Sequence, residues 1–192
     1  INGDGSLSVN GAYRDGIRSK DGLRLCGGNI TVTAVEDGII GKDYLLAAAG
    51  NITVNSGLDG LKSTNSSDSE KGYVSITGGT IDITCGNDGI QAETTLSITG
   101  GDINIVSGGD INIVSGGGSS TVEHTPENDH GFGRGHFGDF STDGSSGFDF
   151  SNLTDSSGNS AESMKGVKAG TAISITGGTL TTDSADDSVH SN

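Results

Sequence analysis

The sequence has few large side chains. It contains no Trp and one Pro, and only 4% of its 192 residues are aromatic and 30% are hydrophobic, whereas Gly occurs 35 times. A compact two-layer domain needs bulky apolar side chains to fill the space between its layers, so this composition argues against one. Stacked repeats need less, because each repeat buries only a few aliphatic side chains against the next. The composition therefore favours a repeat architecture.

Positively charged residues are also scarce. Lys and Arg together number 10 against 25 Asp and Glu, which gives a formal net charge of −15 and a pI of about 4.3. Nucleic acids and anionic membranes would repel such a chain, so we expect neither as a partner. Cations are the expected counterpart.

Long apolar runs and paired cysteines are missing as well. No stretch of about 20 apolar residues is present, so no membrane-spanning helix is predicted. The chain opens at Ile1 without a basic and apolar leader, and we interpret it as a processed or partial chain whose signal peptide has been removed. Cys26 and Cys85 occupy different positions of the repeat described below, several repeats apart, so we expect no disulfide.

What the sequence does contain is a repeat. Asp-Gly followed by an aliphatic residue recurs three times at a constant spacing of 22 residues. The same position recurs after a short insert in the segment STNSSDSEKG, and twice more beyond a long insertion. A fixed period of this length is typical of architectures built from stacked units. The members of this Asp-Gly column are Asp15, Asp37, Asp59, Asp88, Lys165 and Asp187.

Each repeat carries the pattern of three short strands. An aliphatic residue stands two positions after each member of the Asp-Gly column, as at Ile17. Two further stretches, such as 23–25 and 30–32, alternate between apolar and polar residues, and a Gly-Gly pair separates them. Such alternation indicates half-buried strands, and crossovers between parallel strands are almost always right-handed. We predict an all-β chain folded as a right-handed parallel β-helix, a solenoid with about 22 residues and three short strands per coil.

One segment differs from the repeats in composition. Residues 119–161 contain all five Phe, the only Pro and three of the four His. We interpret this segment as a loop extruded from one corner. The predicted organisation is one domain over residues 1–192 with an insertion at about 119–161.

The acidic residues of the repeat suggest a metal site. In the predicted fold they would lie about 5 Å apart, where like charges repel by roughly 1 kcal/mol in water. A second column of oxygen-bearing side chains stands about six residues further along each repeat. Two such columns flanking a turn suit Ca²⁺, which accepts six to eight oxygen ligands. We predict Ca²⁺ ions held by some of Asp15, Asp21, Asp37, Asp43, Asp59, Asn65, Asp88 and Glu93.

An alternative explanation of the Asp-Gly repeat needs no metal. Each Asp side chain can cap its own turn by accepting hydrogen bonds from nearby backbone N–H groups. Lys20, Lys42 and Lys62 would then supply the balancing charge. The residue pattern leaves both explanations open.

Several blocks of the sequence resemble a known family. The blocks DGIIGKDY, DGLKSTN and DGIQAE, together with the closing run ESMKGVKAGTAISITGGTLTTDSADDSVHSN, resemble the bacterial surface carbohydrate-binding β-helix proteins of the pectate-lyase-like superfamily. The resemblance covers nearly all the chain outside about 119–161. It implies a secreted or surface-anchored protein that is similar in fold to polysaccharide lyases and binds calcium. It also implies an association with cellulose-like and pectin-like polymers without clear catalysis.

Three functions follow as hypotheses. The first is a non-catalytic extracellular module that binds polysaccharide and is stabilised by calcium. The second is a structural subunit that associates head to tail through the ends of its repeats into a filament or surface layer. The third is a calcium-dependent polysaccharide lyase, which needs a basic side chain placed beside the metal as a general base. We favour the first, with the filament as the alternative, and we expect no enzymatic activity.

Overall fold

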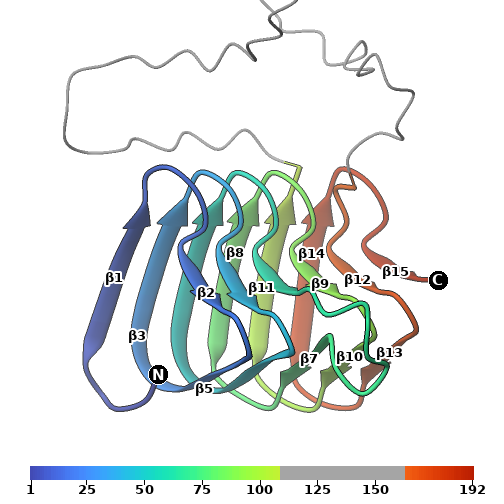
Figure 1. Ribbon diagram of the computed structural model, residues 1–192, viewed down its shortest axis with the longest axis horizontal. Helices are drawn as coiled ribbons and strands as arrows, with labels where there is room; N and C mark the ends of the chain where they lie inside the picture. The colour runs from blue at the N-terminus through green and yellow to red at the C-terminus, as the bar shows by residue number, and fades with distance from the viewer. Residues whose placement is uncertain (109–162) are drawn as a thin grey trace, which may run out of the picture. The chain divides into compact units, whose positions relative to one another are not determined.

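A computed structural model describes residues 1–108 and 163–192, and every regular element in these ranges is a β-strand. The strands form two parallel sheets, sheet A with nine strands and sheet B with six (Figure 1). Within the described ranges no helix is long and apolar enough to cross a membrane. The insertion predicted at about 119–161 lies outside the described residues.

Sheet A contains the longer strands. They are β1 (Ser6–Gly11), β3 (Gly22–Ala34), β5 (Tyr44–Ser56), β7 (Tyr73–Ile76), β8 (Thr80–Cys85), β10 (Thr95–Ile98), β11 (Asp102–Ser107), β13 (Ala172–Ile175) and β14 (Thr179–Ser184). Sheet B contains only three-residue strands. They are β2 (Ile17–Ser19), β4 (Ile39–Gly41), β6 (Leu61–Ser63), β9 (Ile90–Ala92), β12 (Val167–Ala169) and β15 (Val189–Ser191).

The predicted right-handed parallel β-helix with three short strands per coil is wrong. Strands β3 and β5 each run through 13 residues, across the Gly-Gly position at which the sequence pattern predicted a break. The first part of β5 pairs with β7 and its second part pairs with β8. Two of the three predicted strands of each repeat therefore belong to one curled sheet, sheet A, and sheet B is separate.

Glycine forms the corner of sheet A, through which β3 and β5 continue and at which a later repeat divides into the separate strands β7 and β8. Gly50 and Gly79 have φ angles of 101° and 96°, in the region that L-residues rarely adopt. A Cβ atom on Gly50 would lie 2.7 Å from the carbonyl oxygen of Gly28, and one on Gly79 would lie 2.8 Å from that of Gly50. The corner thus needs glycine both for its backbone angle and for the close approach of neighbouring strands.

The predicted alignment of successive repeats is confirmed by the strand pairing. Ile17 pairs with Ile39, Ile39 with Leu61, and Leu61 with Ile90. Ile90 pairs in turn with Val167, although 77 residues separate them in the chain. The aliphatic column therefore continues in register on both sides of the undescribed segment.

The hydrophobic core consists of the inward side chains of the two sheets. Leu25, Ile52 and Leu61 are at most 1% exposed and belong to one cluster of buried residues. Burial of an aliphatic side chain of this size contributes about 1.5 to 3 kcal/mol. Cys26 and Cys85 are both free, as predicted, and burial raises the pKa of the Cys85 thiol to about 12. Cys85 therefore acts as a small apolar core residue.

Candidate binding face and the Asp-Gly column

The Asp-Gly column lies at the start of the sheet B strands, and its middle members are buried. Asp37 is 9% exposed, Asp59 4% and Asp88 2%. Each glycine that follows donates its backbone N–H to the carbonyl oxygen of the next member, as Gly38 does to Asp59 at 2.8 Å. The sequence repeat therefore corresponds to a ladder of neighbouring backbones.

One oxygen of each buried carboxylate binds the backbone of the following repeat. The Oδ1 atom of Asp37 accepts a hydrogen bond from the N–H of Asp59 at 3.0 Å. Asp59 Oδ1 accepts in the same way from Asp88 at 3.0 Å, and Asp88 Oδ1 accepts from Lys165 at 2.9 Å. Each aspartate thus caps the next turn, whereas the metal-free explanation predicted that it caps its own. A buried N–H group without this partner would cost about 1 to 3 kcal/mol.

The second oxygen of each buried carboxylate faces a lysine ammonium group. Lys62 Nζ lies 2.5 Å from Asp59 Oδ2 and 3.5 Å from Asp37 Oδ2. Lys168 Nζ lies 3.3 Å from Asp88 Oδ2. The two lysines occupy the middle positions of β6 and β12, so sheet B itself provides the charges that offset the carboxylates.

Burial shifts the pKa values within this ladder. It raises the pKa of the Asp59 carboxyl above its ordinary value of 3.8, although Lys62 acts in the opposite direction. Burial alone would lower the pKa of Lys62, but the carboxylates of Asp59 and Asp37 outweigh it and hold that pKa above 10.5. Lys62 therefore keeps its proton at neutral pH.

The glycine of the Asp-Gly pair is required by close packing. A Cβ atom on Gly60 would lie 2.4 Å from the Cγ2 atom of Ile83 and 2.5 Å from the carbonyl oxygen of Gly89. Contacts this short with a buried side chain and with the backbone leave no room for a methyl group. The aspartate and the glycine of the motif thus have separate roles, one as a cap and the other as a spacer.

The second predicted column is held together by side-chain contacts of its own. Asn65 Nδ2 donates to Asp43 Oδ1 at 2.7 Å, and Lys71 Nζ lies 3.0 Å from Asp43 Oδ2. Asn65 Oδ1 accepts hydrogen bonds from the backbone and the hydroxyl of Ser67. Asp15, in the first column, pairs with Arg18 at 2.7 Å. The backbone N–H of Asp21 donates to Ser19 Oγ, and the carboxylates of Asp21 and Glu93 form no hydrogen bond or ion pair with another described residue.

These contacts do not fit the predicted calcium ligands. The carboxylates of Asp37, Asp59 and Asp88 already bind backbone N–H groups on one oxygen and ammonium groups on the other. Across residues 1–108 and 163–192, no three His, Cys, Asp or Glu side chains are grouped so that they could hold a metal ion. Ca²⁺ therefore stays a prediction of the sequence, and the geometry of the described residues does not support it.

A second surface, on sheet A, is marked by its lack of carboxylates. Arg24, Leu46, Ser75, Ser97 and Ser174 pair across five neighbouring strands, and they point away from the core because the residues that alternate with them point into it. No Asp or Glu occurs in these strand segments, and Arg24 is their only charged residue. We call this surface the acid-free face. It consists of Gly22, Arg24, Tyr44, Leu46, Tyr73, Ser75, Thr95, Ser97, Ala172 and Ser174.

An aromatic pair and an arginine lie together on the acid-free face. The rings of Tyr44 and Tyr73 stack with centroids 5.4 Å apart and an angle of 11° between their planes. Arg24 Nε donates to the hydroxyl of Tyr44 at 3.2 Å, and the guanidinium carbon lies 5.6 Å from the ring centroid. Gly22 makes room for this arrangement, since a Cβ atom there would lie 2.1 Å from the Tyr44 ring.

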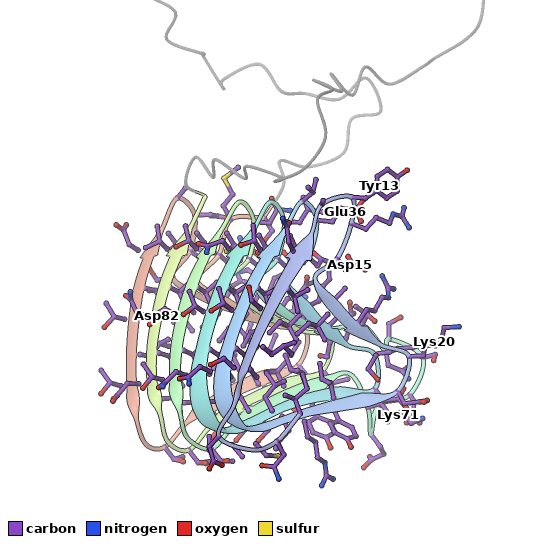
Figure 2. The ribbon with its side chains drawn as sticks, turned by 90° about the vertical axis from the view of Figure 1, so that its left-hand side faces the viewer. Tyr13, Asp15, Lys20, Glu36, Lys71 and Asp82 are labelled. Atoms are coloured by element: carbon purple, nitrogen blue, oxygen red, sulfur yellow. The ribbon has the colours of Figure 1, made fainter. Side chains whose placement is uncertain are left out.

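The other half of sheet A has the opposite charge. Its outward side chains come from β1, β8, β11, β14 and the second parts of β3 and β5, and we call it the Asp82 face. It carries Asp82, Asp102 and Asp183, and these strand segments contain no Lys or Arg. Figure 2 shows Asp82 pointing outward from this broad surface, whereas Lys20 and Lys71 lie on the far side of the molecule.

Sequence reasoning noted that aromatic residues are rare but missed the face. Tyr44 and Tyr73 were recognisable as the rare aromatic residues, but their stacking depends on the seven-residue insert that makes their spacing 29 instead of 22. A comparison of charge between equivalent strand segments would have found the absence of acid. The predictions from sequence concentrated instead on the columns where acid is abundant.

Comparison with known proteins gives a family and a related structure. The family model for carbohydrate-binding domain-containing proteins matches residues 1–192. A solved structure, a gadolinium derivative of the polysaccharide lyase-like protein from C. thermocellum, is similar with 40% sequence identity and a TM-score of 0.54. That match covers 55% of this chain and 43% of the other protein, so the chain spans less than half the length of that relative. No curated protein matches the chain.

The family match extends over the whole chain, including both described ranges and the segment between them. It agrees with the carbohydrate-binding part of the resemblance found in the sequence. The β-helix part of that resemblance is not supported, since the strands form a curled sheet and a separate sheet. The chain belongs to the family of carbohydrate-binding domain-containing proteins.

Proposed function

We propose that the chain is a non-catalytic extracellular protein that binds polysaccharide on the acid-free face of sheet A. Membership of a carbohydrate-binding family and similarity to a polysaccharide lyase-like protein support polysaccharide binding in general. The observation that carries the choice of surface is the distribution of charge. In a chain with a net charge of −15, the acid-free face has no Asp or Glu in its strands.

The chemistry of the acid-free face suits a polysaccharide. Rows of Ser and Thr hydroxyl groups can donate and accept hydrogen bonds, as sugar hydroxyl groups do. The side chains of Tyr44 and Tyr73 are half-buried, and each combines an apolar ring with a polar hydroxyl. Parallel strands repeat these groups about every 4.8 Å, which is comparable to the rise of one sugar in an extended chain. Pectin-like and cellulose-like polymers are therefore the proposed ligands.

Addition of one carboxylate to each half of sheet A tests the choice of surface. Ser97→Asp places a carboxylate on the acid-free face, and Thr31→Asp places one in an outward position of the other half. Binding to immobilised pectin and cellulose is measured for both variants by depletion from solution. We expect Ser97→Asp to weaken binding at least tenfold, because it adds a charge and displaces a hydroxyl at the surface. Equal binding by the two variants would place the polysaccharide elsewhere.

The non-catalytic part of the proposal has its own test. The wild-type chain is incubated with polygalacturonate, and the absorbance of the unsaturated product of a lyase is followed. We expect no increase above a buffer control. Lys62 and Lys168, the cations beside the buried carboxylates, are held in ion pairs, which makes them poor general bases. A steady increase in absorbance would identify a lyase.

The proposal that Ca²⁺ stabilises this polysaccharide-binding protein is supported by the sequence pattern alone. A Ca²⁺ ion in the Asp-Gly column would have to displace the ammonium groups of Lys62 and Lys168 from the carboxylates. Isothermal titration of the full chain with Ca²⁺ tests this form. A heat of binding that a chelator abolishes would support it. The extracellular location is tested separately by fractionation of cells that produce the full-length protein.

Self-association is the second candidate function. Ile175 and Val189 are 44% and 53% exposed, and together with Ile173 they line a depression at the edge formed by β13 and β15. Unpaired backbone groups at the edge of a sheet can pair with a further strand. Sedimentation velocity over a hundredfold range of concentration tests this candidate. A single monomeric species throughout would remove it.

A further inference from the structure

We propose that Arg24 makes the acid-free face selective for polysaccharides that carry carboxylate groups, such as polymers of uronic acids. This inference rests on the proposed function, because it names the class of ligand for the same face. Among the described residues, Arg14 lies 3.6 Å from Glu36 and Arg18 lies 2.7 Å from Asp15, whereas Arg24 has no carboxylate partner.

Arg24 is the one arginine of the described residues without a carboxylate partner, and among the described lysines Lys20 and Lys42 also lack one. Acidic residues outnumber basic ones by 25 to 10, so most cations find a carboxylate nearby. Arg24 lies on β3, the strand at one edge of the acid-free face, and the strands beside it offer Leu46 and then Ser75 at the same position. An anionic ligand would therefore meet a positive charge here without an adjacent carboxylate on the face to repel it.

The guanidinium group is held in place by Tyr44. Nε donates to the tyrosine hydroxyl at 3.2 Å, and the group lies over the ring with its carbon 5.6 Å from the centroid. Of its side-chain nitrogens, only Nε is hydrogen-bonded to a described residue, so the two terminal amino groups remain available. A guanidinium fork in this state can bind a carboxylate through two parallel hydrogen bonds. Because Tyr44 already orients it, less conformational entropy is lost when the ligand binds.

This placement also explains how an acidic polymer could approach an acidic protein. The carboxylates of the Asp-Gly column are turned to backbone N–H and ammonium groups, and those of the Asp82 face lie on the other half of sheet A. Among the described strands of sheet A, only those of the acid-free face contain a Lys or Arg, which is Arg24. Neighbouring hydroxyl groups of Ser75 and Ser97 would then bind the hydroxyl groups of the same sugar chain.

The experiment uses two forms of one polymer, polygalacturonate and its methyl ester, and four proteins: wild type, Arg24→Gln, Arg24→Lys and Arg14→Gln. Arg14→Gln is the matched control, since it removes an equal charge from an exposed arginine outside the face. We expect Arg24→Gln to weaken binding to polygalacturonate about tenfold and to leave binding to the ester unchanged. Arg24→Lys should lose less, because the charge remains while the fork is lost.

The outcomes separate this inference from the proposed function. If wild type binds the ester as well as polygalacturonate, or if Arg24→Gln and Arg14→Gln behave alike, selectivity through Arg24 is overturned while polysaccharide binding stands. If wild type binds neither form, nor cellulose, the proposed function fails and this inference fails with it. Retained circular dichroism of each variant shows that the loss is not one of folding.

Discussion

The Asp-Gly column and the acid-free face use charge in opposite ways. The column contains the most conspicuous acidic residues of the sequence, yet its buried carboxylates bind backbone N–H groups and the lysines of sheet B. The acid-free face has one charged residue in its strands, and that residue has no carboxylate partner among the described residues. The many charged residues of the column stabilise the fold. The single charged residue of the acid-free face, Arg24, remains available for a ligand.

The difference shows why a repeated acidic motif is weak evidence for a binding site. A row of aspartates recurs because each repeat needs a cap for the next one, and this need exists whether or not a ligand is present. A single arginine that breaks the neutral pattern of a surface has no such structural requirement. The comparison predicts that substitutions in the column change stability, whereas substitutions on the face change binding.

The largest expected effect is that of Asp59→Ala. The substitution removes the acceptor of the buried Asp88 N–H and leaves Lys62 with Asp37 alone, at 3.5 Å. We expect the free energy of unfolding to fall by about 3 kcal/mol. Urea denaturation followed by circular dichroism measures it. Asp82→Ala is the control, because Asp82 is an exposed aspartate of the other sheet, and its effect should stay within about 0.5 kcal/mol. Equal losses for the two variants would contradict the structural role of the column.

Glycine-to-alanine substitutions at two positions distinguish the column from the face. Gly60→Ala brings a methyl group against the backbone oxygen of Gly89 and the buried Ile83, so we expect a loss of about 2 kcal/mol in stability. The three atoms nearest to a Cβ at Gly22 all belong to the ring of Tyr44, which can swing away. We expect Gly22→Ala to keep stability within about 1 kcal/mol but to weaken binding to polygalacturonate severalfold, because Tyr44 no longer orients Arg24. Denaturation and binding are measured on both variants, and a reversed pattern would contradict the division of roles.

The sequence predicted the repeat well but not how its strands join. The 22-residue spacing identified the residues that pair across repeats, including Ile90 and Val167 on either side of the long insertion. It did not show that β3 and β5 continue through the Gly-Gly corner, since alternation of apolar residues stops there and strand pairing resumes beyond it after a shift in register. Sheet continuity depends on backbone geometry, which side-chain patterns do not report.

The candidate site was predictable only in part. Like-charge repulsion correctly indicated that the aspartates need partners. Which residues serve as partners depends on distances between side chains, and the spacing of residues in the sequence does not give these distances. Lys62 reaches both Asp59 and Asp37 because the middle position of β6 lies beside the column. Arg24 could have been singled out by its neutral surroundings, but its contact with Tyr44 joins residues 20 positions apart in neighbouring strands.

The smallest expected effect concerns Asp43, at the border between the two regions. Asp43 precedes Tyr44 in the chain, and its carboxylate accepts from Asn65 at 2.7 Å and faces Lys71 at 3.0 Å. These partners, Asn65 first and then Lys71, hold the pKa of Asp43 below its ordinary value of 3.8. A carboxyl with a lowered pKa stabilises the fold in its ionised form, so its contribution is present above about pH 3.8 and is lost as the pH falls through the lowered value.

Asp43→Asn therefore gives a pH-dependent difference. We expect the variant to have a lower Tm than wild type at pH 7, and we expect that difference to shrink as the pH falls below about 3.8, where wild type loses the same contribution. Thermal melts at a series of pH values measure it, and added salt should reduce the difference at pH 7 because the Lys71 pair is partly exposed. A difference that stays constant to about pH 2 would mean that the Asp43 carboxylate contributes to the fold by its shape alone. A Tm difference that is absent at pH 7 would instead make the border resemble the acid-free face, where single changes leave stability intact.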